Sequence, residues 1–346
     1  MGRPSDEDVV TTVDALAWQA HYCRRARSPV AAQILDAVRV DVEAGGSLAG
    51  ELPATVRFGD LVGLRVMATL HRLALERRVP RVALCLPTLG GTAPTVGTVA
   101  GQRFAGDVVE SLATHEGLLA AMLEWTPQTN ETGRAALLRF ALSRLGSGLP
   151  VRLREIGASA GLNLRADVLP GRTDLEFGPL PAVVDRIGCD LHPVDPTTSQ
   201  GRILLSSYIW VDDVARFNRL GDALAVARRV PATVVQQDAG EFVEALNLRA
   251  STLTVLWHSA MWVYLPSETK ARVLAATRRL AAEATAEQPF AHVSWEWSDV
   301  EGRAQSAMPF ELVVRSWAGH PDDGRRRTLA CGMSHGEPWK PVDVVP

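Results

Sequence analysis

The chain contains little lysine and little cysteine, and it has no long run of apolar residues. Lys270 and Lys340 are its only lysines, and its formal net charge is −3. Acidic and basic residues are interspersed, so the sequence lacks the basic face that binding to nucleic acid or a membrane surface requires. No stretch approaches the roughly 18 to 20 apolar residues of a membrane span, and residues 1–14 lack the apolar segment of a signal peptide. We therefore expect a cytoplasmic protein with no nucleic-acid partner and no membrane partner.

The cysteines are too scattered to indicate a metal site or a disulfide framework. No C-x-x-C pair is present, and no histidine stands at ligand spacing beside a cysteine. The four residues are Cys23, Cys85, Cys189 and Cys331. We expect reduced thiols and no metal.

The first part of the chain is predicted to be helical. Apolar residues recur at helical spacing over 11–43, a helix pair interrupted near Ser28-Pro29, and over 61–78, 105–125 and 131–145. Thr129 or Asn130 is a candidate N-cap of the last helix. A short apolar run at 82–86 leads into a loop rich in Gly, Pro and Thr. The breaker cluster at 146–150 then separates two predicted domains, an all-helical domain over 1–148 and a second domain over 149–346.

Strand-like runs alternate with helices in the second domain. The predicted strands are 151–156, 187–191, 233–237, 253–257, 290–297, 312–317 and 328–331, and the predicted helices are 162–168, 212–229, 240–248 and 267–286. Helical crossovers make the early strands parallel, whereas the short polar turn at 318–327 suits an antiparallel hairpin. A further hairpin is expected around Gly171 and Gly178. The prediction is an α/β fold with a Rossmann-like, seven-stranded, mostly parallel sheet that ends in an antiparallel hairpin.

The most informative segment runs from Val151 to Asn163, where a strand enters a Gly-rich turn and then a helix. Small residues at such a turn allow close approach of a ligand, and a helix N-terminus attracts an anion. Glu155 at the strand end supplies a negative charge for a cationic amine. Together these features predict a site for a zwitterionic group such as the methionine part of S-adenosylmethionine.

This segment resembles motif I of class I methyltransferases, acid-x-Gly-x-Gly-x-Gly, with Ser159 in place of the middle glycine. Nearly the whole chain also resembles the uncharacterised bacterial family DUF2332, for which no reaction is known. That second resemblance rests on residues 128–131, 155–163, 186–190, 237–239 and 255–265. The first resemblance implies S-adenosylmethionine as cofactor, and the second implies no activity.

The methyltransferase resemblance implies further cofactor-binding residues. An acidic residue after the second strand holds the ribose hydroxyls, and Asp190 is the candidate, with Asp185 and Asp195 as alternatives. A carboxylate after the third strand meets the adenine amino group, which Asp238 matches, although Asp238 equally suits the N-cap of the next helix. The predicted cofactor-binding set is Glu155, Gly157, Ser159, Gly161, Asn163, Asp190, Gln237, Asp238 and Ala239.

Residues 256–265 follow the fourth strand, where the methyltransferase resemblance places the transferable methyl group. His258 is the candidate general base because its unperturbed pKa is about 6.5, although a hydrogen-bonded histidine that only shapes the pocket fits equally well. Aromatic faces suit a cationic sulfonium. The predicted substrate-binding residues are Gln128, Asn130, Glu131, Arg134, Trp210, Trp262 and Tyr264.

We expect a transferase that acts on a small molecule, and self-association as a homodimer stays open. The same cofactor would also serve a cyclase or an aminocarboxypropyl transferase. Gly157-Ala-Ser159-Ala-Gly161 also matches the G-x-S-x-G turn of α/β-hydrolases, with Ser159 as nucleophile and Asp299 and His335 as partners. A cofactor-binding protein without catalytic activity is the third alternative.

Overall fold

The computed structural model describes residues 7–170, 179–298, 306–320 and 323–342, and it forms two compact units. The first unit comprises Met1–Thr129 with Thr198–Asn218, and the second comprises Asn130–Thr197 with Arg219–Pro346. This division differs from the predicted boundary at residue 148. The helix before that boundary packs on the sheet, and residues 198–218 belong to the first unit. The expected hairpin around Gly171 and Gly178 lies outside the described residues.

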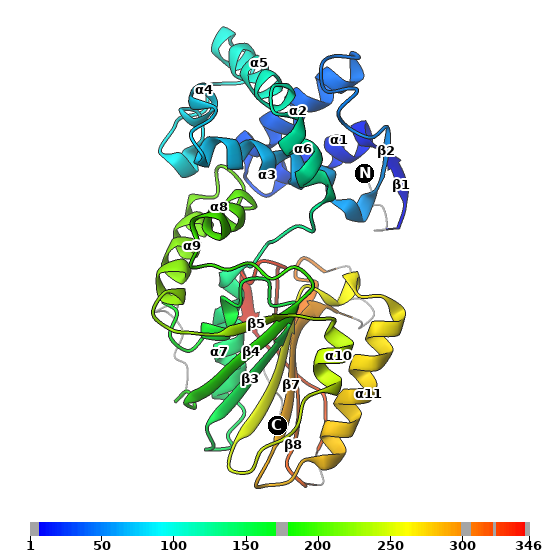
Figure 1. The fold of residues 1–346 in the computed structure, drawn as a ribbon, viewed down its shortest axis with the longest axis vertical. Helices are drawn as coiled ribbons and strands as arrows, with labels where there is room; N and C mark the ends of the chain where they lie inside the picture. Colours follow the sequence, from blue (N-terminus) through cyan, green and yellow to red (C-terminus); the bar gives the residue numbers. More distant parts are fainter. Residues whose placement is uncertain (1–6, 171–178, 299–305, 321–322, 343–346) are drawn as a thin grey trace. The chain divides into compact units, whose positions relative to one another are not determined.

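Helices dominate the first unit (Figure 1). They are α1 (Thr12–Arg25), α2 (Pro29–Glu43), α3 (Val62–Leu75), α4 (Pro80–Ala83), α5 (Val99–Ala113), α6 (Glu116–Glu124) and α8 (Ser199–Ser207), with short 3₁₀ turns η1 (Phe58–Asp60) and η2 (Pro87–Leu89). Their apolar faces meet in one core that includes Leu16, Ile34, Leu35 and Leu70. Periodic apolar spacing therefore predicted the main helices of this unit.

Two expectations for the first unit were wrong in detail. The unit is not all-helical, because β1 (Val9–Thr11) pairs antiparallel with β2 (Thr55–Arg57), and strands of three residues show no visible alternation. The helix expected over residues 105–125 is two helices, α5 and α6, which are separated by Thr114 and His115. The apolar run at 82–86 begins within the short helix α4, whose first residue is Pro80.

A buried histidine joins three segments of the first unit. His71 on α3 donates from Nδ1 to the Ile209 carbonyl (3.0 Å), so in the neutral ring Nε2 accepts the hydroxyl hydrogen of Thr88 (3.0 Å). Burial lowers the pKa of His71 from 6.5 to about 4, against the opposing effect of the Ile209 carbonyl. The folded protein therefore holds this ring neutral at pH values where the unfolded chain protonates it.

Acidification is expected to destabilise the protein through His71. Because its folded-state pKa is depressed, the stabilisation is complete above pH 6.5 and is lost as the pH falls toward 4, by about 3 kcal/mol in total. Denaturant unfolding at several pH values would show this loss in the wild type and a flatter profile in His71→Gln, whose amide can donate and accept but does not titrate. Parallel profiles for the two proteins would contradict the assignment.

The second unit is built on an eight-stranded mixed sheet with the order β10-β9-β8-β7-β6-β3-β4-β5. The strands are β3 (Val151–Ile156), β4 (Val183–Asp190), β5 (Thr233–Gln236), β6 (Leu253–Ser259), β7 (Phe290–Trp297), β8 (Phe310–Trp317), β9 (Arg327–Gly332) and β10 (Trp339–Pro341). Five neighbouring strands of the sheet, β5, β4, β3, β6 and β7, are parallel to one another. The strands β8, β9 and β10 are antiparallel to their neighbours. The predicted parallel core and antiparallel C-terminal strands are confirmed.

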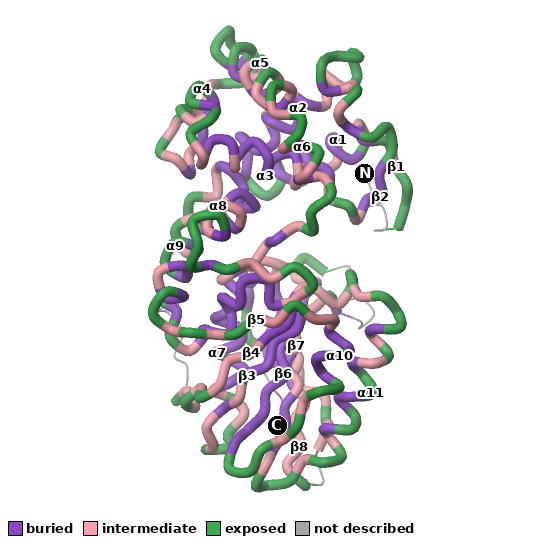
Figure 2. The backbone as a smooth tube through the Cα atoms, in the orientation of Figure 1, coloured by how far each residue is buried: buried purple, intermediate pink, exposed green. Residues whose placement is uncertain are grey.

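Helices pack on both faces of this sheet (Figure 1). α10 (Ala239–Glu244) and α11 (Ser267–Glu283) cover one face, and α7 (Ala135–Ser143) packs on the other and contacts β7 and β8. α9 (Val214–Ala227) belongs to the crossover between β4 and β5. Every residue of the central strand β6 is buried (Figure 2), which is expected of a parallel strand that is covered on both faces.

Two expectations for the second unit were wrong. Among the described residues the sheet has eight strands and not seven, because β10 adds three residues beside β9. A strand this short that contains a proline shows no strand pattern in the sequence. The helix expected over 162–168 is only a single 3₁₀ turn, η4 (Asn163–Arg165). The strand order reverses between β3 and β6, and parallel α/β sheets bind ligands at the carboxyl ends of the strands at such a point.

Candidate functional site

The turn after β3 contains three residues with left-handed backbone conformation. The φ angles are +66° at Gly157, +52° at Ser159 and +64° at Gly161. Glycine adopts such angles without strain, whereas serine pays about 1 kcal/mol or more. Ser159 thus adopts a backbone conformation that glycine would adopt without strain.

The small residues of the turn also serve internal packing. A methyl group added at Gly161 would lie 2.7 Å from Val234 Cγ2, and one added at Gly157 would lie 3.0 Å from both Cγ and Cε of Met261. Gly188 on β4 is in turn packed against Ala158. Packing within the fold therefore requires Gly161 and Gly188, whatever ligand binds beside them, whereas the neighbour of Gly157 is the flexible Met261 side chain.

Most backbone N–H groups of the turn already have acceptors. Ala158 N–H donates to the Cys189 carbonyl (2.9 Å), and Gly161 N–H donates to the Ala158 carbonyl (2.7 Å). Ser159 N–H donates to Asp190 Oδ2 (2.8 Å). Leu162 N–H donates to Asn130 Oδ1 (3.0 Å). Because these four N–H groups are already hydrogen-bonded, they are not available to bind an anion. Acceptors of the protein itself occupy the expected anion site.

The predicted residues on β4 and after β5 lie beside this turn or cap a helix. Asp190 ends β4, and its Oδ1 accepts the His192 N–H (2.9 Å), which leaves each carboxylate oxygen a second lone pair. Gln237 N–H donates to the Asp190 carbonyl (3.0 Å). Asp238 caps α10 by accepting from Gly240 N–H (2.8 Å), and Ala239 is the buried first residue of that helix. The N-cap role expected as one of two roles for Asp238 is confirmed.

Glu155 and Asn163 are buried acceptors at the two ends of the turn. Glu155 is 2% exposed and Asn163 is 1% exposed. Glu155 Oε2 and Asn163 Oδ1 have no hydrogen-bond partner among the described residues. Burial raises the pKa of Glu155 well above its usual range, and the positive charge of Arg134 opposes that shift. Unmatched buried acceptors cost free energy, which a bound donor would recover.

Buried donors lie on the same face of the sheet as Glu155. Glu155 pairs with Trp257 across β3 and β6, so their side chains point to the same face. Trp295 Nε1 is buried and has no acceptor among the described residues, whereas hydrogen bonding from the Trp257 side chain opposes the rise in the pKa of Glu155. This face therefore holds one unmatched donor, Trp295 Nε1, and one unmatched acceptor, Glu155 Oε2, a combination that suits a polar ligand with groups of both kinds.

The segment that precedes α7 lies against the turn after β3, within the second unit. As described above, the Asn130 side chain accepts the backbone N–H of Leu162. Arg134 is 8% exposed, and it donates from Nη1 to the Ser259 carbonyl (3.1 Å) and from Nε to the Ser334 carbonyl (2.9 Å). Buried Glu131 accepts the Gly133 N–H (2.8 Å), and Arg219 Nη2 lies 3.8 Å away. These residues, predicted to bind substrate, thus join the end of β3 to the end of β6.

His258 forms a hydrogen-bonded chain with two residues of β7. Its Nδ1 lies 2.8 Å from Glu296 Oε1, and its Nε2 lies 3.0 Å from His292 Nε2. Burial lowers the pKa of His292 well below 6.5, with smaller contributions from His258 and Arg315. The neutral His292 ring donates to His258 when His258 donates to Glu296. His258 would then act as a base only after breaking its bond to His292.

Glu155 and His258 point to opposite faces of the sheet. Trp257 shares a face with Glu155, and successive residues of a strand alternate. The His258 face is the one covered by α10 and α11, because Leu256 and Phe290 on that face pack with both helices. The two faces meet only at the carboxyl edge, at Ser259 and the residues after it.

The predicted aromatic residues divide between the two units. Trp210 is a core residue of the first unit and packs edge-on against Tyr22 (5.8 Å between ring centroids). Trp262 stacks on His258 (5.2 Å), and Tyr264, also on the turn η5 (Trp262–Tyr264), is 60% exposed. Trp262 and Tyr264 are therefore the predicted aromatic residues at the carboxyl edge of β6. Gln128 is buried and is the next-to-last residue of its segment of the first unit.

The hydrolase alternative requires Ser159, Asp299 and His335. The Ser159 φ angle is consistent with a sharp nucleophile turn, but the residue is buried. His335 Nδ1 lies 3.9 Å from Glu131 Oε2, and Asp299 lies outside the described residues. The described part of the chain thus places His335 beside Glu131.

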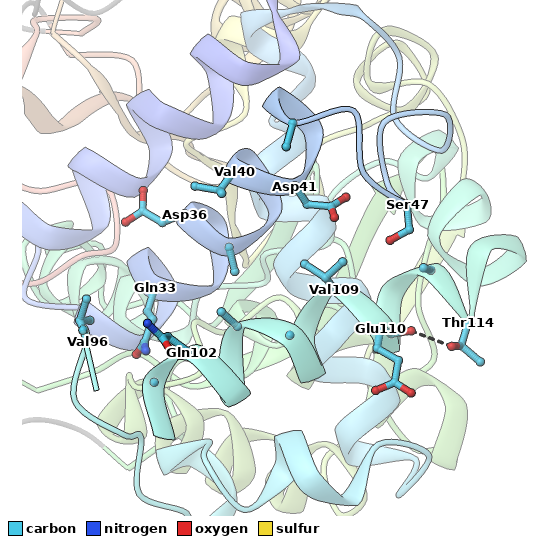
Figure 3. A pocket seen from close by; sticks show the side chains of 17 residues that line it. Gln33, Asp36, Val40, Asp41, Ser47, Val96, Gln102, Val109, Glu110 and Thr114 are labelled. Carbon is cyan, nitrogen blue, oxygen red and sulfur yellow. Dashed lines mark hydrogen bonds between the residues drawn. The ribbon is translucent and has the colours of Figure 1, made fainter. Parts of the chain in front are cut away.

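A separate pocket of about 830 Å³ lies in the first unit, between α2 and α5 (Figure 3). Its walls are mainly small or apolar, and its acidic residues have partners within the unit. Asp36 is paired with Arg24, Asp41 accepts the Leu48 N–H, and Glu110 is paired with Arg81. None of the predicted site residues lines this pocket.

Several residues of the site were not predicted from the sequence. They are His292, Glu296, Arg165 and Met261, and Arg165 donates from Nη1 to the Gly161 carbonyl (2.7 Å). The spacing of His292 and Glu296 on one strand was visible, but their partner became apparent only from the register of β6 and β7. Among the described residues, no group of three or more His, Cys, Asp or Glu could hold a metal ion, and no helix could cross a membrane.

The fold and site define an α/β protein with a buried polar cluster at the carboxyl edge of its parallel strands. The chain belongs to the DUF2332 family, described as an uncharacterized protein conserved in bacteria, and the family model matches residues 13–340. The resemblance to this family is thereby confirmed. Searches of curated proteins and of solved structures found no match.

Proposed function

We propose that this protein is an S-adenosylmethionine-dependent transferase, most simply a methyltransferase, that acts on a small molecule. The observation that carries the proposal is the buried carboxyl group of Glu155, whose Oε2 has no partner among the described residues. Glu155 is the next-to-last residue of β3, a parallel strand beside which the strand order of the sheet reverses. A ligand ammonium group would supply the missing donor.

The surrounding residues fit the amino-acid end of this cofactor in part. Glu155 and Asn163 would accept from its ammonium group, and the unmatched indole N–H of Trp295 offers a donor on the same face of the sheet as Glu155. Asp190 keeps lone pairs for hydroxyl groups. The turn itself offers few donors for a carboxylate, since four of its N–H groups are already bonded.

The cofactor would supply an electrophilic methyl group bound to a sulfonium sulfur. The protein's own part would be to orient the acceptor and to exclude water. Trp262 and Tyr264 at the end of β6 would contact the substrate, and Trp262 is held by its stacking on His258. His258 lies on the opposite face from Glu155, so its part would be to hold Trp262 at the carboxyl edge, with Glu296 and His292 fixing its ring.

Calorimetric titration with S-adenosylmethionine and S-adenosylhomocysteine tests the proposal. We expect both to bind the full chain, and Glu155→Gln to weaken binding by about 10- to 100-fold, because the amide oxygen can still accept but lacks the negative charge that strengthens the bond to an ammonium group. Affinity should rise with pH, since the carboxylate form of Glu155 binds a cation and its pKa is raised.

The matched control is Glu311→Gln. Glu311 is an equally buried glutamate of the second unit, but Arg326 and Ser298 already engage it. This variant should bind both ligands as the wild type does. Absence of binding by the wild-type protein, or equal binding by Glu155→Gln, would contradict the proposed function.

A further inference from the structure

The side chain of Met261 covers the first glycine of the turn after β3. A methyl group on Gly157 would lie 3.0 Å from Met261 Cγ, 3.0 Å from its Cε and 3.2 Å from its Cβ. Met261 also packs at the edge of the core that contains Ile156 and Phe242. Any ligand that approaches the backbone of Gly157 on this side therefore meets the Met261 thioether first.

The backbone beneath Met261 is held in place. Glu296 Oε1 accepts the N–H groups of Met261 (3.1 Å) and Trp262 (3.3 Å), in addition to its contact with His258. The preceding residue, Ala260, has a φ of +49°, and its N–H donates to the Trp295 carbonyl (2.9 Å). A methionine side chain rotates about three bonds, so it can leave Gly157 without any movement of this anchored backbone.

We propose that Met261 is a specificity-determining residue of the site, because its side chain occupies the space over Gly157 that a bound ligand needs. This inference rests on the proposed function, in which the turn binds S-adenosylmethionine. The ligand must displace the thioether, and the equilibrium between covered and open positions lowers the apparent affinity. The length and flexibility of residue 261 then set which ligands reach the turn, while Glu296 acts as the positioning residue of its backbone.

Titration of two Met261 variants with S-adenosylhomocysteine tests this inference. Met261→Ala removes the covering atoms, so we expect binding to tighten by about tenfold. Met261→Phe places a larger and stiffer group over Gly157, so we expect binding to weaken by about tenfold or more. Leu246→Ala is the control, because Leu246 packs on the same core and its truncation removes similar volume. Leu246→Ala should bind as the wild type does.

The outcomes separate the two proposals. If Met261→Ala and the wild type bind equally, or if Met261→Ala binds more weakly, the inference is overturned and the proposed function stands. If neither protein binds the ligand, the proposed function fails and the inference fails with it. Thermal unfolding of each variant identifies a change in affinity that comes only from loss of folded protein.

Discussion

Replacement of Glu155 by glutamine is expected to stabilise the ligand-free protein, although it removes the residue most important for binding. The wild-type side chain is buried with one oxygen unmatched, and burial raises its pKa. An acid whose folded-state pKa is raised binds more protons folded than unfolded, so stability falls as the pH rises from the ordinary glutamate value toward the raised one. Glutamine does not titrate and avoids this loss.

The increase in the free energy of unfolding caused by Glu155→Gln should be largest at neutral to mildly alkaline pH. It should vanish near pH 4, where the wild-type glutamate is protonated in both the folded and the unfolded state. An increase of about 1 to 3 kcal/mol is expected from the usual cost of an unmatched buried group. For a protein of this size, that is roughly 2–4 °C in melting temperature for each kcal/mol. Differential scanning calorimetry between pH 4 and pH 8 measures both the gain and its pH dependence.

Glu311→Gln is the informative control here as well. Its carboxylate accepts from Arg326 Nη2 (2.7 Å) and from Ser298 Oγ (2.7 Å), so the same substitution should destabilise the protein. Opposite signs for two buried glutamates would identify Glu155 as the residue retained for a ligand. If Glu155→Gln were also destabilised at every pH, Glu155 would be a structural residue, and the main support for the proposed function would be removed.

Much of the second unit could be predicted because its strands are long and its helices separate them. β3 and β7 have the predicted bounds, and the parallel core follows from the helical crossovers. The failures have a common physical cause. β1, β2 and β10 are three residues long, and an element of that length has too few residues to show a period.

The candidate site was predictable where it is local in sequence. Glu155 and Asn163 lie within one strand and turn, so the motif alone indicated both. The relation of His258 to His292 depends on strand register, and the contact of Met261 with Gly157 depends on the conformation of a distant turn. Such contacts are set by tertiary packing, which no single segment encodes.

Replacement of Arg134 by alanine is expected to cost about 3 to 5 kcal/mol, the largest loss among the substitutions considered. Its guanidinium is buried and donates to the carbonyls of Ser259 and Ser334. Removal leaves these two acceptors without that donor and removes a positive charge that favours ionised Glu155. Arg134→Lys should recover only part of the loss, because an ammonium group lacks the planar geometry that reaches both carbonyls.

A double-mutant cycle with Glu155→Gln distinguishes a structural role of Arg134 from substrate binding. Since Arg134 lowers the pKa of Glu155, its removal should cost less in the Glu155→Gln background, by about 1 kcal/mol. Chemical denaturation of the four proteins at pH 7 measures this coupling. A stable Arg134→Ala protein that had lost only ligand affinity would show instead that Arg134 serves the ligand. A large loss of stability that is coupled to Glu155 would show that Arg134 holds the ends of β3 and β6 in the arrangement to which a ligand binds.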